Sequence, residues 1–488
     1  MRYAEYAKYK YVGILHHTGT LLLGVGLYLL LPLVVLLSHP QDSVYIMSFL
    51  YSSLISIAAG TSFRLIGRGA REASLDLAEG GVIVFITWTA AMALSALPFH
   101  LSGLLSFRNS LFESVSGWTT TGLSVVDVSR TPAIFLMWRS LMQFAGGAGL
   151  AIVMLSAILG PHGRGLYQAE GRTEQLLPNV KRSAKTVMMI YSGYTAAGAV
   201  LYMTAGMTPF DSINHALSAL STGGFSTRVA SIGYYDSVFI QAVTMVLMLL
   251  GSTNFATHYV LLRGKFRAVT RNGELRTTVV LLAIFVPIVL ACVVSPLHPF
   301  TKAVGISLFE TISALSTTGY STVSYNDWPG LAVACLVVLM LVGGGICSTA
   351  GGIKQYRIYI LVKSVVWEIK SHLLPRTAVR ENYIWKGESK FYVSHEHIKE
   401  IGIFFFIYMS TYIMGVLIFL AHGYPFRESL FEFASALGTV GLSSGLTEAG
   451  MPSGVLWTEI AGMFLGRLEF FVIIYSLVKI IRDITVRK

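Results

Sequence analysis

The chain contains the stretch Leu111-Phe-Glu-Ser-Val-Ser-Gly-Trp-Thr-Thr-Thr-Gly-Leu-Ser124, and its Thr-x-Gly-x-Ser ending recurs at three later places. The glycines of the four copies are 102, 95 and 122 residues apart, which is too long for a solenoid repeat. Such spacing suits a membrane unit of two helices with a segment between them. An ionisable residue stands nine positions before each glycine. The glycines are Gly122, Gly224, Gly319 and Gly441, and the residues before them are Glu113, His215, Glu310 and Glu432.

Composition places the chain in a lipid bilayer. Of its 488 residues, 54% are hydrophobic and only 12% are charged, whereas soluble domains carry about 25% charged residues. Apolar runs of roughly 20 residues recur, the length that a helix needs to cross a membrane. The net charge of +11 is concentrated in alternate loops, as the positive-inside rule expects, and does not indicate a nucleic-acid partner. We therefore expect an all-α polytopic membrane protein.

Two apolar helices precede the first copy, and each copy then lies between an outgoing and a returning helix. Ten spans would place both chain ends in the cytoplasm, and each copy would end a re-entrant pore helix of about ten residues, too short to span. The expected units are residues 1–72 (two extra helices), 73–185, 186–276, 277–400 (with a long cytoplasmic loop) and 401–488. The expected spans are 11–37 and 44–66, outgoing 81–98, 186–206, 277–295 and 401–421, and returning 133–160, 237–262, 331–353 and 455–481.

The repeated pattern at membrane depth indicates an ion filter. Non-helical backbone inside a membrane is tolerated only where protein buries it or water reaches it. Glycine permits dihedral angles that turn carbonyl oxygens toward an axis, and rings of such oxygens can replace the hydration shell of a cation. The pore helix would point the negative end of its dipole at that cation. The alternative, that Thr and Gly only let helices pack closely, does not explain one copy in each of four units.

These features resemble the Trk/Ktr/HKT superfamily of potassium transporters, and most of all its bacterial TrkH/TrkG branch. The resemblance covers nearly the whole chain, including the two extra N-terminal helices that the Ktr membrane subunits lack. It implies four pore loops with fourfold pseudo-symmetry around one pore. Some family members replace the first filter glycine with serine and select sodium, so Gly122 favours potassium. The potassium-binding residues that the resemblance implies are Thr120, Thr121, Gly122, Thr222, Gly223, Gly224, Thr317, Thr318, Gly319, Thr439, Val440 and Gly441.

The second copy departs from the other three. It has Gly223 where the others have Thr or Val, and His215 where the others have Glu. We therefore expect the symmetry of the filter to be approximate. Glu113, Glu310 and Glu432 stand near the starts of the pore helices, where the helix dipole favours a carboxylate. For these three residues we prefer a structural role to ion binding.

A glycine-rich stretch, Gly343-Gly-Gly-Ile-Cys-Ser-Thr-Ala-Gly-Gly352, interrupts the third returning span. Each Gly costs a helix about 1 kcal/mol relative to Ala, so we expect a broken helix, which resembles the intramembrane gating loop of the family. No Gly-Lys-Ser/Thr follows, so the stretch is not a phosphate-binding loop and we expect no nucleotide site in this chain. Gly146 and Gly251 are expected to serve close helix packing instead. The glycines assigned to the gate are Gly343, Gly344, Gly345, Gly351 and Gly352.

Arg467 lies 26 residues after Gly441, which places it about 18 Å into the last returning helix at 1.5 Å per residue. A charge at that depth is costly and indicates a function. Beneath a cation filter it would form an electrostatic barrier, and in the family the matching arginine narrows the pore opposite the gating loop. The alternative is a structural pair with a buried carboxylate. Glu469 cannot be assumed as that partner, because residues two apart do not face each other on a helix.

The sequence therefore predicts a potassium uptake protein of the cytoplasmic (inner) membrane, with K+ as the transported ion and a channel-like, gated pore. A potassium–proton or sodium-coupled symporter is the alternative, and Glu459 and Glu469 are its only candidate carboxylates in the last returning helix. An intramembrane enzyme would need a catalytic cluster at membrane depth, and we find none. The resemblance further implies a homodimer and a cytosolic TrkA-like nucleotide-binding regulatory subunit, which would dock on the basic loop near 354–399 and the C-terminal tail.

Overall fold

The computed structural model describes residues 3–70, 77–149, 180–293, 299–373, 375, 381–386 and 389–485. Within them the chain is a bundle of helices, which confirms the predicted all-α polytopic class. The strand content of these residues is one short antiparallel hairpin, in which β1 (Tyr383–Lys386) pairs with β2 (Ser389–Tyr392).

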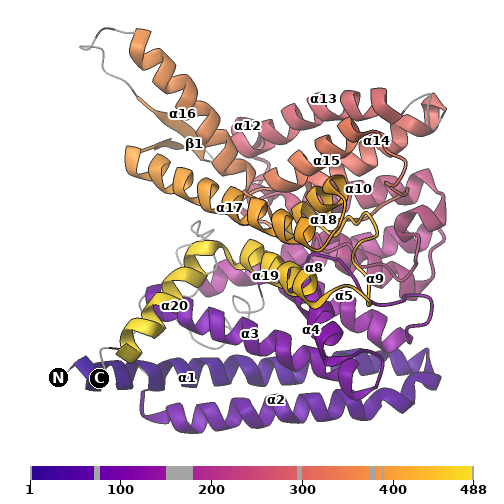
Figure 1. Ribbon diagram of the computed structural model, residues 1–488, viewed down its shortest axis with the longest axis vertical. Coiled ribbons are helices and arrows are strands. Elements are labelled where there is room, and N and C mark those ends of the chain that lie inside the picture. Colours follow the sequence, from indigo (N-terminus) through magenta and orange to yellow (C-terminus); the bar gives the residue numbers. More distant parts are fainter. Residues whose placement is uncertain are drawn as a thin grey trace.

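The first two helices, α1 (Tyr3–Tyr28) and α2 (Ile46–Ile66), lie side by side along one edge of the molecule (Figure 1). They touch at two glycines, since a Cβ on Gly19 would lie 2.6 Å from the Gly60 carbonyl oxygen. The Ser53 hydroxyl donates across the same interface to the Gly26 carbonyl at 2.7 Å. Small residues that let two backbones approach are the usual means of pairing helices in lipid. This pair stands outside the four repeated units.

Each of the four units has a long outgoing helix, a short helix, a loop and a returning helix. The short helices contain 12 to 16 residues, about 18–24 Å at 1.5 Å per residue, and so cannot cross a hydrocarbon core of about 30 Å. The outgoing helices are α3 (Leu77–Leu101), α8 (Val180–Thr204), α13 (Gly273–Val293) and α17 (His395–Ala421). The short helices are α4 (Phe107–Trp118), α9 (Pro209–Leu220), α14 (Phe300–Leu315) and α18 (Phe426–Gly438).

Local chemistry sets where the short helices begin. The Ser106 side chain accepts a hydrogen bond from the Asn109 N–H, and the Thr208 side chain accepts one from the Asp211 N–H. A hydroxyl at this position satisfies an N–H group that the first turn leaves without a partner. Prolines precede the other two short helices, where their fixed φ suits the entry of the chain into a helix.

The returning helices differ from unit to unit. In the first unit the described part is α5, and the other three units each contain a break. The helices are α5 (Ala133–Ala148), α10 (Val238–Ser252) with α11 (Phe255–Leu262), α15 (Gly330–Val342), and α19 (Ser453–Leu468) with α20 (Phe470–Thr485).

The expectation of continuous returning helices over 237–262 and 455–481 is therefore wrong, whereas the break expected within 331–353 is present. Helices α10 and α11 meet at 107°, because Thr253 between them has extended backbone. Helix α15 stops where Gly343 has a φ of +72°, and Glu469, with a φ of +56°, separates α19 from α20. The part of the expected span 133–160 beyond residue 149 lies outside the described residues.

These breaks bear on the number of membrane spans. Five helical segments of the described chain are long and apolar enough to cross a membrane, or six if the bent pair α10–α11 counts as one span. The number of ten spans, like the unit boundaries, stays a prediction.

The last helix returns to the first ones. The Tyr11 hydroxyl of α1 donates to Asp483 of α20 at 3.2 Å, and Lys479 lies 3.9 Å from Glu79 of α3. The two chain ends consequently lie at the same end of the molecule, whereas α16 (Gln355–Leu373) and the hairpin extend away from the bundle (Figure 1). The other described elements are α12 (Phe266–Arg271) and short 3-10 helices at Leu31–Leu37, Pro40–Tyr45, Gly67–Ala70 and Ser231–Tyr235.

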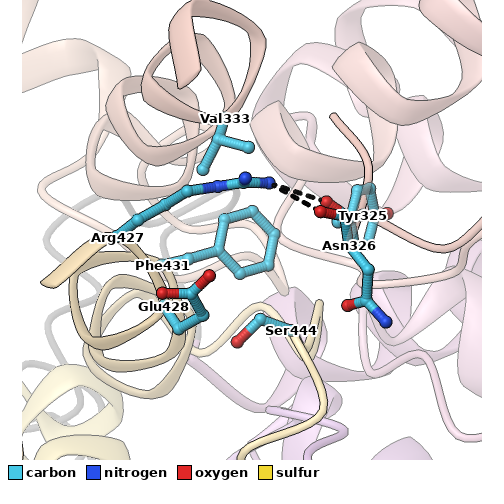
Figure 2. A pocket seen from close by; sticks show the side chains of 7 residues that line it. All are labelled: Tyr325, Asn326, Val333, Arg427, Glu428, Phe431 and Ser444. Carbon is cyan, nitrogen blue, oxygen red and sulfur yellow. Dashed lines mark hydrogen bonds between the residues drawn. The ribbon is translucent and has the colours of Figure 1, made fainter. Parts of the chain in front are cut away.

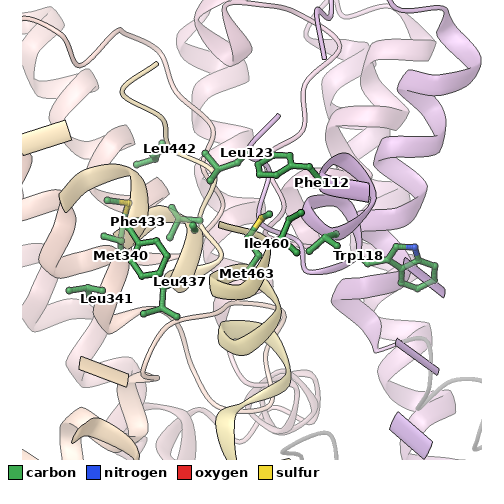
Figure 3. Packing of buried hydrophobic residues seen from close by; sticks show 14 of the residues in the cluster. Phe112, Trp118, Leu123, Met340, Leu341, Phe433, Leu437, Leu442, Ile460 and Met463 are labelled. Atoms are coloured by element: carbon green, nitrogen blue, oxygen red, sulfur yellow. The ribbon is translucent and has the colours of Figure 1, made fainter. Parts of the chain in front are cut away.

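Large apolar side chains pack around the short helices of the first and last units. Figure 3 shows Trp118 of α4 and Phe433 of α18 among the side chains of returning helices such as Met340 and Met463, all of them buried. Because lipid is as apolar as these side chains, close packing rather than the hydrophobic effect stabilises this arrangement. Trp118 is the last residue of α4, so this packing holds the helix end from which the first loop starts.

Candidate functional site

The four loops that follow the short helices share one backbone conformation. The threonine two residues before each glycine has a φ between +51° and +56°, and the glycine itself has a φ between +74° and +96°. A threonine in the left-handed region is a conformational outlier, and its recurrence in four copies points to a function. The threonines are Thr120, Thr222, Thr317 and Thr439.

The N–H groups of these loops are used inside their own units. The residue before each glycine donates its N–H to the carbonyl of a serine six residues before the glycine, at 2.9 to 3.1 Å in all four copies. No role was predicted for these serines from the sequence, although their spacing is regular. They are Ser116, Ser218, Ser313 and Ser435.

The four loops form a closed ring. A Cβ added to Gly122 would lie 2.1 Å from the carbonyl oxygen of Gly223, the residue before the glycine of the second loop. The same relation runs from the second loop to Thr318 O, from the third to Val440 O, and from the fourth back to Thr121 O, at 2.0 to 2.3 Å. Each loop thus places one carbonyl against the glycine of the preceding loop. The structure therefore brings all twelve predicted filter residues together around one axis.

Carboxylates behind the ring hold three of the loops. Glu432 accepts hydrogen bonds from the Ser443 hydroxyl at 2.6 Å and from the Ser444 N–H at 2.8 Å. Glu310 accepts from the N–H and hydroxyl of Thr322, and Glu113 from the Val125 N–H and from Arg139, whose Nε lies 2.6 Å away. These carboxylates are fully buried and bond to the chain just beyond each filter glycine. Their geometry is that of structural supports.

The second loop is supported differently. His215 contacts the Ser226 hydroxyl through Nε2 at 2.9 Å, in the place of a carboxylate. Gln143 of α5 donates its side-chain N–H to the Gly223 carbonyl at 2.5 Å and accepts from the Phe225 N–H at 3.1 Å. Gln143 was missed by sequence reasoning, because nothing local links residue 143 to a loop 80 residues later.

A vestibule of about 490 Å³ opens above the ring, and it is lined by the four predicted filter glycines and by residues after them. Arg228 at its rim lies 2.6 Å from Asp211. Burial would raise the pKa of Asp211, but hydrogen bonds from Thr227 and Arg228 hold it below its usual value. Nearby, Arg427 donates to the Tyr325 carbonyl at 2.8 Å and so connects the third and fourth units (Figure 2).

The glycine-rich stretch folds into a non-helical loop from 343 to 354 beneath the ring, as its glycines predict. The loop closes on itself, because the Ile353 N–H donates to Leu341 O at 2.9 Å and a Cβ on Gly343 would lie 2.1 Å from Gly351 O. It is anchored to the second unit where the Gly345 N–H donates to Ser252 O at 2.8 Å. We call residues 343–354 the lower loop.

The lower loop touches three of the four filter threonines from below. The Gly351 N–H donates to the Thr317 hydroxyl at 2.8 Å, and the Thr222 hydroxyl donates to Thr349 at 3.0 Å. A Cβ on Gly351 would lie 2.0 Å from the Thr439 hydroxyl oxygen, so only glycine fits there. Among the assigned glycines, Gly343, Gly351 and Gly352 close the loop, while Gly344 and Gly345 contact Ser252.

Arg467 lies at the same level as the lower loop. Its guanidinium donates to the Thr349 carbonyl of this loop and to the Gly146 carbonyl of α5. The side chain thus bridges the fourth, third and first units beneath the ring. Glu469 pairs instead with Arg357 of α16 at 2.6 Å. The ion pair links the break between α19 and α20 to the start of α16, just after the lower loop. It was not predicted from the sequence.

The glycines expected to serve packing do lie at close contacts. A Cβ on Gly146 would lie 1.9 Å from Trp118 O, and one on Gly251 would lie 2.4 Å from Leu220 O. Gly466 has the same relation to Leu437 O, at 2.0 Å. In three units, therefore, a glycine of the returning helix packs against the last turn of the short helix.

Four short helices whose loops close into one ring inside a helical membrane protein define a membrane transport protein rather than an enzyme. A family model described as "TrkH: Cation transport protein" matches residues 46–483, and the chain belongs to this family.

Individual relatives are similar in sequence to this chain over almost its full length. The chain is 31% identical to the Trk system potassium uptake protein TrkG of Escherichia coli, over 94% of this chain and 96% of the relative. It is 30% identical to an uncharacterized cation transporter of Methanocaldococcus jannaschii, over 94% and 93% of the two chains. The crystal structure of the potassium transporter TrkH from Vibrio parahaemolyticus superposes with a TM-score of 0.83 at 27% identity, covering 95% of this chain and 98% of that one.

Proposed function

We propose that this protein takes up potassium across the cytoplasmic membrane through a selective, gated pore. The observation that carries the proposal is the closed ring of loop carbonyls, one against each filter glycine. Carbonyl rings of this kind replace the hydration shell of potassium. The names of the TrkG and TrkH relatives, which are potassium uptake proteins, point to the same ion.

The threonines beneath the ring complete the proposed filter. The hydroxyl oxygens of Thr120 and Thr439 are buried and have no hydrogen-bond partner within the described chain. A buried oxygen without a partner is costly, and a dehydrated cation at the lower end of the filter would satisfy both. In this proposal K+ is the cargo, held by Thr120, Thr121, Gly122, Thr222, Gly223, Gly224, Thr317, Thr318, Gly319, Thr439, Val440 and Gly441.

We propose that Arg467 and the lower loop form the gate. A positive charge directly below a cation filter opposes passage, and the hydrogen bond from Arg467 to Thr349 O supports a closed arrangement. Release of this contact would allow the lower loop to leave the path. Gly343, Gly344, Gly345, Gly351 and Gly352 allow the chain to turn within the bilayer.

The distribution of carboxylates favours channel-like permeation over coupled symport. A proton relay needs a carboxylate along the path, but Glu469 is paired with Arg357 and Glu459 accepts from Thr447 at 3.1 Å behind the fourth loop. Neither carboxylate faces the ring. A potassium–proton or sodium-coupled symporter is therefore the second candidate.

The proposed assembly is a homodimer with a cytosolic TrkA-like regulatory subunit, with both chain ends in the cytoplasm. Helix α16 exposes Val362, Val365, Ile369 and Leu373 at helical spacing, and this apolar stripe supports contact with a second copy. The position of the chain ends at one end of the molecule supports the topology (Figure 1). Cross-linking through cysteines placed on this stripe would test the dimer.

Cation flux into liposomes that contain only this protein tests the proposal. Potassium, rubidium, sodium and lithium are compared with and without a pH gradient, for the parent and for Gly441→Ser. A serine Cβ would lie 2.3 Å from Thr121 O at a φ of +96°, so the ring would be distorted. Gly402→Ser is the control, since a Cβ at this helical glycine meets no atom within 4 Å.

We expect potassium and rubidium to pass, sodium and lithium to be excluded, and Gly441→Ser alone to lose this preference. Equal discrimination by parent and Gly441→Ser would reject the ring as the filter. Flux that ignores the pH gradient supports the channel, whereas flux that requires the gradient would support the symporter.

A further inference from the structure

The proposed filter has one carbonyl that differs from its three counterparts. The carbonyls of Thr121, Thr318 and Val440 accept no hydrogen bond within the described chain, whereas Gly223 O accepts one from Gln143 at 2.5 Å. An accepted amide hydrogen bond occupies a lone pair and holds the peptide in one orientation. The second carbonyl of the ring is therefore tethered, and the other three are not.

The tether explains why the second copy has glycine where the others have Thr or Val. A Cβ on residue 223 would lie 2.3 Å from Cδ of Gln143 and 2.5 Å from its Oε1. The amide of Gln143 thus occupies the space that the side chain of residue 223 would need. Gly223 and Gln143 form one structural unit, although they belong to different repeats.

The tether is itself held firmly in place. Gln143 is fully buried, and its Oε1 accepts the Phe225 N–H at 3.1 Å while its Nε2 donates to Gly223 O. One turn earlier on α5, Arg139 lies 3.9 Å above the ring of Phe225 and pairs with Glu113. The Tyr320 hydroxyl of the third loop donates to Phe225 O at 3.1 Å. Residues of the first and third units therefore hold the segment that contains Gly223 and Phe225.

The corresponding positions of other returning helices cannot act in this way. Gln143 stands three residues before Gly146, which packs against the end of a short helix. Three residues before the equivalent glycines Gly251 and Gly466 stand Met248 and Met463, both buried. A thioether cannot donate a hydrogen bond to a carbonyl. Among these three packing positions, the donor is present only in the first unit.

From this geometry we propose that Gln143 is a specificity-determining residue that sets the potassium-over-sodium preference by tethering the Gly223 carbonyl. A tethered carbonyl cannot move inward to complete a smaller coordination shell, so the ring stays at the size that suits the larger ion. This inference rests on the proposed potassium pore and adds a role for one residue in it. Gln143 acts by positioning a ligand oxygen rather than by contacting the ion.

The test replaces Gln143 with methionine, which keeps the length of the side chain but removes both its N–H donor to Gly223 O and its acceptor of the Phe225 N–H. Purified Gln143→Met, Met248→Ala and parent protein are reconstituted, and rubidium and sodium fluxes are measured together with the KM for potassium. Met248→Ala is the matched control, because it removes buried volume at an equivalent position without altering a hydrogen bond to the ring. Size-exclusion profiles verify that each variant folds.

We expect Gln143→Met to pass rubidium at a rate near that of the parent while its potassium-over-sodium ratio falls about fivefold to tenfold, about 1 to 1.4 kcal/mol of discrimination. Met248→Ala should keep the parental ratio. An unchanged ratio in Gln143→Met, or an equal fall in Met248→Ala, would overturn the inference. If the parent itself does not discriminate, the proposed function fails instead, so the two failures are distinguishable.

If Gln143→Met does not fold, a second pair of variants tests whether the Gln143 amide and a side chain at position 223 compete for the same space. Gly223→Ala alone should abolish selective flux, because its Cβ meets the Gln143 amide. The double variant Gln143→Ala with Gly223→Ala should recover flux, but with the reduced ratio expected of an untethered carbonyl. Recovery of the full parental ratio would contradict the tether, as would normal selectivity in Gly223→Ala alone.

Discussion

The four units are nearly alike in the proposed filter ring but differ from one another in the layer beneath it. In the ring, four threonines have φ values within 5° of one another, and each loop meets the next through the same contact. Beneath it, α10 and α11 meet at 107°, α15 ends at the lower loop, and α19 ends before Glu469. The ring is proposed to replace a hydration shell, which needs an oxygen from every side. A barrier needs only one part that can move. The four units therefore have to be alike at the ring but can differ from one another below it.

The largest expected effect comes from adding one carbon to the ring. Gly319→Ala would place a Cβ 2.0 Å from Val440 O at a φ of +80°, which distorts both loops. We expect the potassium-over-sodium flux ratio to fall about hundredfold, about 2.8 kcal/mol. Gly305→Ala in the same unit is the control, since its Cβ would meet nothing within 4 Å. Similar ratios in both variants would show that the ring does not select the ion.

A change below the ring should alter rate without altering preference. Arg467→Gln removes the charge that faces Thr349 O and Gly146 O. We expect potassium flux into liposomes to rise about tenfold, about 1.4 kcal/mol of barrier, at a constant potassium-over-sodium ratio. Arg482→Gln, at an exposed position of α20, should change neither quantity. A changed potassium-over-sodium ratio at a constant potassium flux would show that Arg467 contributes to ion selection rather than to gating.

The buried carboxylate of Glu432 behind the ring should affect the stability of the protein more than its ion selectivity. Glu432→Gln keeps the shape of the side chain but replaces one carboxylate oxygen with an NH2 group. The hydroxyls of Ser443, Ser444 and Thr447 now donate to the carboxylate, and an NH2 group cannot accept their hydrogen bonds. We expect a loss of about 1–3 kcal/mol in unfolding free energy, seen as a lower thermal midpoint in detergent. Glu448→Gln, on an exposed residue, is the comparison. An unchanged midpoint in Glu432→Gln would reject the structural role.

The smallest effect concerns the ion pair between Arg357 and Glu469, which is partly exposed at 13% and 18%. Single neutralising variants and the double variant form a cycle whose coupling energy we expect to be about 0.5–1 kcal/mol. Flux should change about twofold, by the same factor in the single and double variants, because either change breaks the one contact. Strictly additive effects would show that the pair does not act as a unit.

Much of the ring could be predicted because its signal is local and repeated. Thr-x-Gly-x-Ser sets the dihedral angles of each loop, and apolar runs set the helices around it. The breaks in the returning helices were harder to predict. Only the third has a glycine-rich stretch, whereas Thr253 and Glu469 carry no strong local signal, and continuous spans were expected there.

The sequence by itself determined the membrane class, the four copies and the position of the glycine in each loop of the ring, because hydropathy and glycine conformation act within a few residues. Only the tertiary structure decided which loop meets which neighbour and why residue 223 is glycine. It also decided that Arg467 reaches Thr349 O and Gly146 O rather than a carboxylate. These contacts join residues 80 to 321 positions apart. Their partners are chosen by how the units pack around one axis, which no local pattern encodes.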